Sequence, residues 1–132
     1  MSRGIKHIEF WVSNVHKSMT FYDGLFSILG WEKVSENGFK FESTKIYFKE
    51  SRVLHCDSLG PRHICFLASG RDEVNKVGEF LQRNGYSIIH GPVEMCEPNY
   101  SLGYYTIDFR DPDGYILEVA HSPAQTSNNK LE

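Results

Sequence analysis

This sequence of 132 residues has few cysteines, no long apolar run and no sign of a signal peptide, three features that would indicate its location in the cell or a membrane partner. There are only three cysteines, an odd number without close pairs, which favours free thiols in a reducing compartment over a disulfide framework. The longest apolar runs, 64–68 and 116–120, are about five residues each, far below the roughly 20 that cross a bilayer. The start of the chain also lacks the apolar core of a signal peptide. We therefore expect no membrane partner and a cytoplasmic location.

Excess positive charge is absent as well. The chain has 14 basic and 17 acidic residues, a formal charge of -3, and no run of lysine or arginine that would follow a phosphate backbone. Nucleic acid is therefore not an expected partner. The 40% of hydrophobic residues is enough for one ordinary core, so we expect a single domain over 1–132 with a flexible tail at 122–132.

What the sequence does contain is an internal repeat. Residues 6–13 read KHIEFWVS and residues 62–69 read RHICFLAS, so a basic residue, His, Ile, Phe and Ser recur at a spacing of 56. An amphipathic helix is predicted after each copy, from 14 to 29 with a stop at Gly30, and from 69 to 84 with Ser69 and Asp72 at its start. The apolar stripe at three-to-four spacing consists of Val15, Met19, Tyr22, Leu25, Phe26 and Leu29 in the first helix and of Val74, Val77, Phe80 and Leu81 in the second. The repeat therefore predicts two similar modules.

Three strand-like runs follow each predicted helix. They cover 31–34, 39–42 and 45–49 in the first half, and 86–89, 104–109 and 115–120 in the second. A tight turn is predicted at 111–114, which reads DPDG, and a long loop over 91–103. The expected fold class is α+β, with two strand, helix, strand, strand, strand modules over about 4–52 and 61–121.

Side-chain alternation divides each strand into a core face and an opposite face. In the first strand the apolar residues at 8, 10 and 12 suit the core, which leaves His7, Glu9 and Trp11 on the other side. The same parity places His63 on the opposite face of the equivalent strand in the second half. In the last strand it places Glu118 there. Two imidazoles and one carboxylate are thus candidates for one site.

A divalent metal ion would compensate such a group, because it accepts both ligand types and offsets the cost of burying a carboxylate. A single strand histidine is more often a structural residue, but the repetition at His63 and the presence of Glu118 strengthen the case for ligands. The other histidines, at 16, 55, 90 and 121, are expected at the surface. Cys65 is expected to act as a small buried hydrophobe.

Four segments together resemble the vicinal oxygen chelate superfamily, which contains glyoxalases, bleomycin resistance proteins and extradiol dioxygenases. They are KHIEFWVSNV, FYDGLFSILGW, RHICFLAS and FRDPDGYILEV, and the resemblance covers residues 5–121. It implies two βαβββ modules whose curled mixed sheets surround a cleft, often completed in a homodimer. It also implies one divalent metal ion held by His7, His63 and Glu118.

For the reaction, the resemblance implies a metal-dependent glyoxalase-like lyase or isomerase acting on a small substrate with vicinal oxygens. The position of a fourth, carboxylate ligand falls on Tyr47, so a catalytic proton transfer is assigned to Tyr47 and Glu9. Trp11, Lys49 and Tyr105 are the candidate substrate-binding residues. The identity of the metal stays open among Zn, Ni, Mn, Co and Fe(II).

Two alternatives remain at this point. Two histidines and one carboxylate are also the ligand set of non-haem iron oxygenases, so an Fe(II) extradiol-type dioxygenase that cleaves a catechol is the second reading. The third is a non-catalytic drug-binding protein similar to bleomycin resistance proteins, although those usually lack the three ligands. Retention of all three favours an enzyme.

Overall fold

The computed structural model describes residues 3–53 and 60–123, and the chain divides into two compact units, Met1–Leu59 and Gly60–Glu132. We call them module one and module two. Each has the expected order of one strand, one helix and three further strands. Within the described ranges no helix has the length and apolar character needed to span a membrane. Cys56, the 54–59 segment and most of the predicted tail lie outside the described residues.

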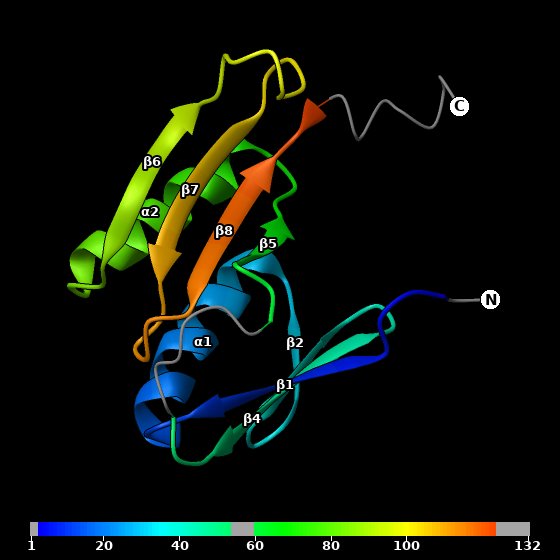
Figure 1. Ribbon diagram of the computed structural model, residues 1–132, viewed down its shortest axis with the longest axis vertical. Helices are drawn as coiled ribbons and strands as arrows, with labels where there is room; N and C mark the ends of the chain where they lie inside the picture. Colours follow the sequence, from blue (N-terminus) through cyan, green and yellow to red (C-terminus); the bar gives the residue numbers. More distant parts are fainter. Residues whose placement is uncertain (1–2, 54–59, 124–132) are drawn as a thin grey trace. The chain divides into compact units, whose positions relative to one another are not determined.

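Module one contains one helix and a four-stranded mixed sheet (Figure 1). Its elements are β1 (His7–Val12), α1 (Val15–Leu29), β2 (Glu32–Ser35), β3 (Gly38–Phe41) and β4 (Thr44–Glu50). The strand order is β1-β4-β3-β2, with β1 parallel to β4 and the other neighbours antiparallel. Parallel strands need a long crossover connection between them, and α1 forms part of the connection from β1 to β4.

The predicted boundaries of α1 are confirmed, and side chains explain both ends. Asn14 caps the helix by accepting a hydrogen bond from the amide three residues on, and Glu50 Oε1 accepts the amide of Val15 at 2.9 Å. At the other end Gly30 adopts the left-handed conformation with φ 80°. Glu50 therefore ties the start of α1 to the end of β4.

The core of module one is rich in aromatic rings. Tyr22 of α1 lies 4.2 Å from Phe48 of β4 between ring centroids, and Phe26 lies 4.8 Å from Phe39 of β3. The predicted helix stripe is buried except at Val15, which is half-buried. Phe21, which the stripe omitted, is fully buried, so the buried surface of α1 is wider than its periodicity indicated.

Module two repeats the plan with β5 (Ile64–Leu67), α2 (Arg71–Arg83), β6 (Ile88–Glu94), β7 (Tyr105–Arg110) and β8 (Ile116–His121). The strand order is β5-β8-β7-β6, and β5 is parallel to β8. Helix α2 packs along one face of this sheet (Figure 1). Its predicted stripe is buried, with side chains Val74, Val77, Phe80 and Leu81.

Two local predictions for module two are corrected by the structure. The loop predicted over 91–103 is shorter, because β6 continues through Pro92 to Glu94 and pairs with β7. Proline is tolerated there because β6 is an edge strand. The start of α2 also differs, since the cap residue is Gly70 and the hydroxyl of Ser69 donates to Glu73 rather than to Asp72.

The turn predicted at 111–114 joins β7 to β8 and is organised by a buried carboxylate. Asp111 is 4% exposed, and its Oδ1 accepts the amides of Asp113 and Tyr115, both at 2.9 Å. The amide of Gly114 donates to the carbonyl of Asp111 at 3.0 Å. This network sets where β8 begins, and with it the position of Glu118.

Replacing this carboxylate should destabilise the protein. We expect Asp111→Ala to lower the free energy of unfolding by about 1–3 kcal/mol, because two amides lose a charged acceptor. Asp111→Asn keeps a side-chain oxygen and should lose less, and urea denaturation of both variants measures the difference. Equal losses in the two variants would contradict a role for the acceptor.

Candidate functional site

One face of the module one sheet carries five of the predicted site residues. His7, Glu9 and Trp11 alternate along β1, and their partners across the parallel pair are positions 45, 47 and 49 of β4. Trp11 is 52% exposed, and its Nε1 donates to Glu9 Oε2 at 2.9 Å. Alternation therefore brings His7, Glu9, Trp11, Tyr47 and Lys49 to the face away from the aromatic core.

Tyr47 is held against this face by its neighbours. Its ring meets the His7 imidazole edge-on, with 5.9 Å between centroids. Gly38 of β3 lies opposite Tyr47, and a Cβ at position 38 would stand 2.8 Å from the Tyr47 ring. The absence of a side chain at position 38 therefore gives the tyrosine ring its space.

In module two, His63 and Glu118 are directly paired. His63 Nε2 lies 3.1 Å from Glu118 Oε1, and Glu118 is 8% exposed. The other oxygen, Oε2, accepts hydrogen bonds from the hydroxyls of Tyr104 and Thr106, each at 2.7 Å. Burial and the hydrogen bond to Glu118 raise the pKa of Tyr104, so its hydroxyl stays a donor. Two hydroxyls thus hold Oε2 of Glu118, and Oε1 faces His63.

The pairing registers of the two modules are equivalent. Glu9 lies opposite Tyr47 between β1 and β4, and Cys65, which follows Glu9 by the repeat spacing of 56, lies opposite Glu118 between β5 and β8. Tyr47 therefore occupies the place in module one that Glu118 occupies in module two. The repeat in the sequence aligns residues 46–48 with residues 117–119, and the two pairing registers agree with this alignment.

A second histidine and carboxylate pair lies next to the first. Asp108 of β7 is directly opposite Glu118 of β8, and His90 of β6 is directly opposite Asp108, with 3.8 Å between Nδ1 and Oδ2. Partial burial, followed by the nearby charge of Glu118, raises the pKa of Asp108. His63, Glu118, Asp108 and His90 therefore lie across one face of the sheet.

A pocket of about 220 Å³ opens on this face, and we call it the Glu118 pocket. Charged and polar side chains share its wall with apolar ones. The lining residues are Arg62, His63, Ile89, Met95, Tyr100, Thr106, Asp108, Ile116 and Glu118. All of them belong to module two, so this pocket is formed within one module.

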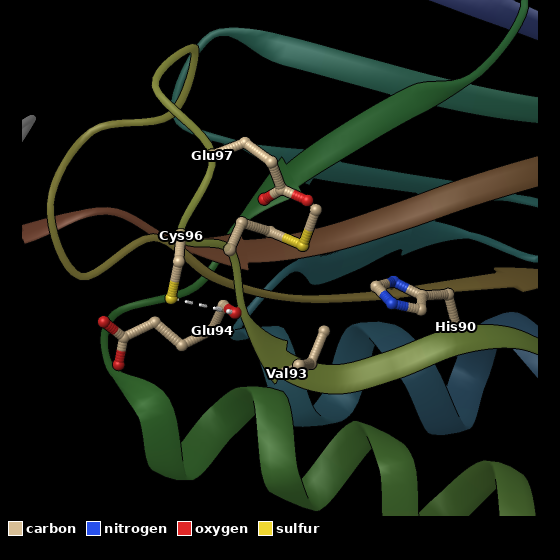
Figure 2. A pocket seen from close by; sticks show the side chains of 6 residues that line it. His90, Val93, Glu94, Cys96 and Glu97 are labelled. Atoms are coloured by element: carbon tan, nitrogen blue, oxygen red, sulfur yellow. Dashed lines mark hydrogen bonds between the residues drawn. The ribbon is translucent and has the colours of Figure 1, made fainter.

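A second hollow, of about 360 Å³, lies at the end of β6 (Figure 2). It shares Met95 with the Glu118 pocket. His90 and Val93 line it from the strand, and Cys96 and Glu97 from the segment that follows. The Cys96 thiol is directed to the carbonyl of Glu94 at 3.9 Å. This hollow therefore continues the surface of the Glu118 pocket through the shared Met95.

Tyr105 lies on the other face of the module two sheet. Its hydroxyl donates to Asn75 of α2 at 2.7 Å, and the Arg71 guanidinium lies over its ring at 4.6 Å. The structure thus does not bring Tyr105 to Glu118, and its role in substrate binding stays a prediction. Tyr104, one residue earlier, is the tyrosine that contacts the carboxylate.

Sequence reasoning missed several members of this group, although a signal for them was present. Ile107 and Phe109 are apolar and buried, so alternation along β7 assigns Thr106 and Asp108 to the opposite face, where Glu118 lies. His90 was expected at the surface and is indeed exposed, but its contact with Asp108 depends on a shifted register in β6 that alternation does not predict.

The donor set of module two fits two ligands of a divalent metal ion. Two ligand atoms, each about 2.1 Å from one ion and at right angles, lie about 3 Å apart, and the pair His63 Nε2 and Glu118 Oε1 has this separation. Tyr104 and Thr106 hold the carboxylate as hydrogen-bonded partners of metal ligands commonly do. Among the described residues, no group of three or more histidine, cysteine or carboxylate side chains is gathered to hold a metal ion. His7 belongs to module one, and its place in the triad stays a prediction.

A family model matches residues 4–119, nearly the whole described chain. The chain belongs to the Glyoxalase/Bleomycin resistance protein/Dioxygenase superfamily. This confirms the resemblance and the fold of two βαβββ modules. The superfamily includes lyases and dioxygenases, so membership does not select one reaction.

Solved structures share the fold at low sequence identity. A candidate glyoxalase from Bacillus halodurans is 23% identical with a TM-score of 0.76, covering 89% of this chain and 94% of its own. A glyoxalase/dioxygenase from Nostoc punctiforme is 19% identical with a TM-score of 0.69, covering 92% of each chain. A lactoylglutathione lyase from Agrobacterium tumefaciens is 21% identical with a TM-score of 0.61, covering 91% and 94%. A search of curated proteins gives no significant match.

The hydrogen bond from Thr106 to the buried Glu118 should contribute to stability. We expect Thr106→Val, which is similar in shape, to lower the free energy of unfolding of metal-free protein by about 1–3 kcal/mol, because a charged acceptor loses a buried donor. Ser101→Ala removes a neutral hydroxyl pair with Ser122 and serves as the control, with a loss of about 1 kcal/mol. A Thr106→Val variant as stable as wild type in urea would contradict the prediction.

Cys65 was expected to act as a small buried hydrophobe, but the structure leaves this residue exposed, with its thiol 3.9 Å from the Tyr104 hydroxyl. The two described cysteines should still differ in reactivity. Partial burial of the thiol, and then the charge of Glu118, raise the pKa of Cys65 to about 12, so little thiolate exists near neutral pH. In metal-free protein, alkylation of Cys65 by iodoacetamide should be slower than that of Cys96 at pH 8 and should keep rising up to pH 10. Glu118→Gln removes the negative charge and should speed the reaction, as peptide mapping would measure. An early plateau in the wild-type rate would contradict the raised pKa.

Proposed function

We propose that this chain is a divalent-metal-dependent glyoxalase-like enzyme, of the lyase or isomerase type, acting on a small substrate with vicinal oxygens. The proposed ligands are His7, His63 and Glu118. The observation that carries the proposal is the His63 and Glu118 pair, 3.1 Å apart, with the second carboxylate oxygen held by Tyr104 and Thr106. The proposal includes a cytoplasmic location, because free thiols favour a reducing compartment. It also includes assembly as a homodimer.

A metal ion bound there would act as a Lewis acid that draws negative charge from the substrate's adjacent oxygens. The chain's own contribution to such a site is orientation. Two hydroxyls fix Glu118 Oε2, so the carboxylate cannot rotate away from His63 without breaking both hydrogen bonds. The apolar residues of the Glu118 pocket would exclude water from the bound substrate.

The proton transfer that an isomerisation requires is assigned to the module one face. Glu9 Oε2 accepts the indole N–H of Trp11, and Oε1 has no hydrogen-bond partner among the described residues, so one oxygen is fixed and the other can accept a proton. In this role Glu9 takes a proton from the carbon next to the substrate carbonyl and returns it to the neighbouring position. The Tyr47 hydroxyl donates to the developing negative charge, and Trp11 and Lys49 bind the substrate beside them.

The same ligand set supports a second candidate, an Fe(II) extradiol-type dioxygenase that cleaves a catechol. The two enzymes differ in an observable way. The dioxygenase consumes oxygen and needs Fe(II), whereas the lyase converts a hemithioacetal without oxygen. A non-catalytic drug-binding protein would do neither and would bind its ligand without turnover.

Metal content tests the proposed ligands. Protein purified anaerobically without chelator should contain about one divalent metal ion per chain, and His63→Ala and Glu118→Ala should each lose most of it, because a missing ligand weakens the site severely. Elemental analysis measures the content and identifies the ion. Iron would direct the assays to catechols, and nickel or zinc to hemithioacetals.

A matched control separates a specific loss from general damage. His16→Ala alters an exposed histidine on α1 and should keep the wild-type metal content. Circular dichroism of all variants shows whether they fold. Wild-type metal content in a folded His63→Ala variant would refute the ligand assignment, and a wild type that binds no metal after reconstitution would favour the drug-binding reading.

A further inference from the structure

We infer that Arg62 forms an anion-binding subsite of the Glu118 pocket and that the substrate carries a carboxylate in addition to its vicinal oxygens. The inference rests on the proposed function and deepens it, because it names the chemical class of the substrate. Arg62 directly precedes the ligand candidate His63 in the chain and lines the same pocket.

The other charged groups of the pocket already have partners. Glu118 is bonded by His63, Tyr104 and Thr106, and Asp108 lies 3.8 Å from His90. Arg62 is exposed and forms no hydrogen bond or ion pair with any residue of the described ranges. The positive charge of Arg62 acts on Asp108 only at longer range. It lowers the pKa of that carboxyl, but burial has the larger effect and raises it. Its guanidinium is therefore available to a ligand.

The charges of the pocket indicate the sign of that ligand. Without a metal ion, Arg62 opposes the two carboxylates Asp108 and Glu118, so these three side chains together contribute one net negative charge to the pocket. A bound divalent ion reverses this to one net positive charge. The ion and the guanidinium then repel each other in a partly enclosed space, and a negative group between them would relieve the repulsion.

Arginine is also suited in shape to the proposed group. Its planar guanidinium offers two parallel N–H donors to the two oxygens of a carboxylate, which a lysine cannot do. The pocket volume of about 220 Å³ lies below the roughly 300–1,000 Å³ of sites for drug-sized ligands. Ile89, Met95 and Ile116 supply apolar walls for a short carbon skeleton or ring. The expected ligand is thus a small carboxylate with two adjacent oxygens.

The test compares probes that differ only in the carboxylate. Catechol, 2,3-dihydroxybenzoate and 3,4-dihydroxybenzoate all present adjacent oxygens, and the two acids place a carboxylate at different positions. Binding is measured by calorimetry to metal-free and metal-loaded protein, for wild type, Arg62→Gln and Arg62→Lys. We expect one of the acids to bind wild-type protein at least roughly tenfold more tightly than catechol, as a charge-assisted contact predicts.

Arg62→Gln should abolish the preference, so that the acid and catechol bind this variant with similar affinity, and Arg62→Lys should restore only part of the preference. Arg83→Gln removes the same charge from the exposed last turn of α2 and should keep the wild-type preference. If neither acid is preferred in either form of the protein, or if Arg62→Gln keeps the preference, the inference fails. That failure is distinct from failure of the proposed function, which the metal content of wild type and His63→Ala measures.

Discussion

The arrangement of the site depends on one constraint, the parallel pairing of the first and last strands of each module. Because side chains alternate along paired strands, this register decides which residues share a face. It places Glu9 opposite Tyr47 in module one and Cys65 opposite Glu118 in module two. A shift of one residue would turn Glu118 into the core and bring Leu117 or Val119 to the open face. The buried turn at Asp111 helps to prevent such a shift.

The same register gives the two modules different chemistry. In module two the central position holds a buried carboxylate, and burial would be costly without the hydroxyls of Tyr104 and Thr106. In module one the equivalent position holds Tyr47, whose ring lies over Gly38. In module two, the position equivalent to Gly38 is occupied by Asp108. Asp108 adds a second carboxylate beside Glu118, whereas Gly38 leaves space for the Tyr47 ring. The repeat is therefore symmetric in its strand pairing and asymmetric in the side chains that it presents.

Much of this could be predicted from the sequence, because the relevant signals are local or periodic. The repeat at a spacing of 56 gave the modules, and alternation assigned His7, Glu9 and Glu118 to their faces, as the structure confirms. The end of β6 was missed because a strand that contains Pro92 resembles a loop. The face of Tyr105 was missed although alternation with the buried Ile107 and Phe109 assigns it to the side of α2. The partner that it meets there, Asn75, lies 30 residues away in the chain and is decided by packing between elements and not by spacing.

The charge of the Glu118 pocket links its two proposed features. The pocket has two carboxylates and one guanidinium, so its net charge is negative until a divalent cation binds. It therefore attracts a cation first, and it attracts an anion only after the cation is bound. Binding should therefore be ordered, with the metal ion first and an anionic substrate second. An uncharged substrate would gain nothing from this reversal, and Arg62 would then weaken metal binding without any compensating contact. The presence of Arg62 beside His63 is explained most directly if the substrate is an anion.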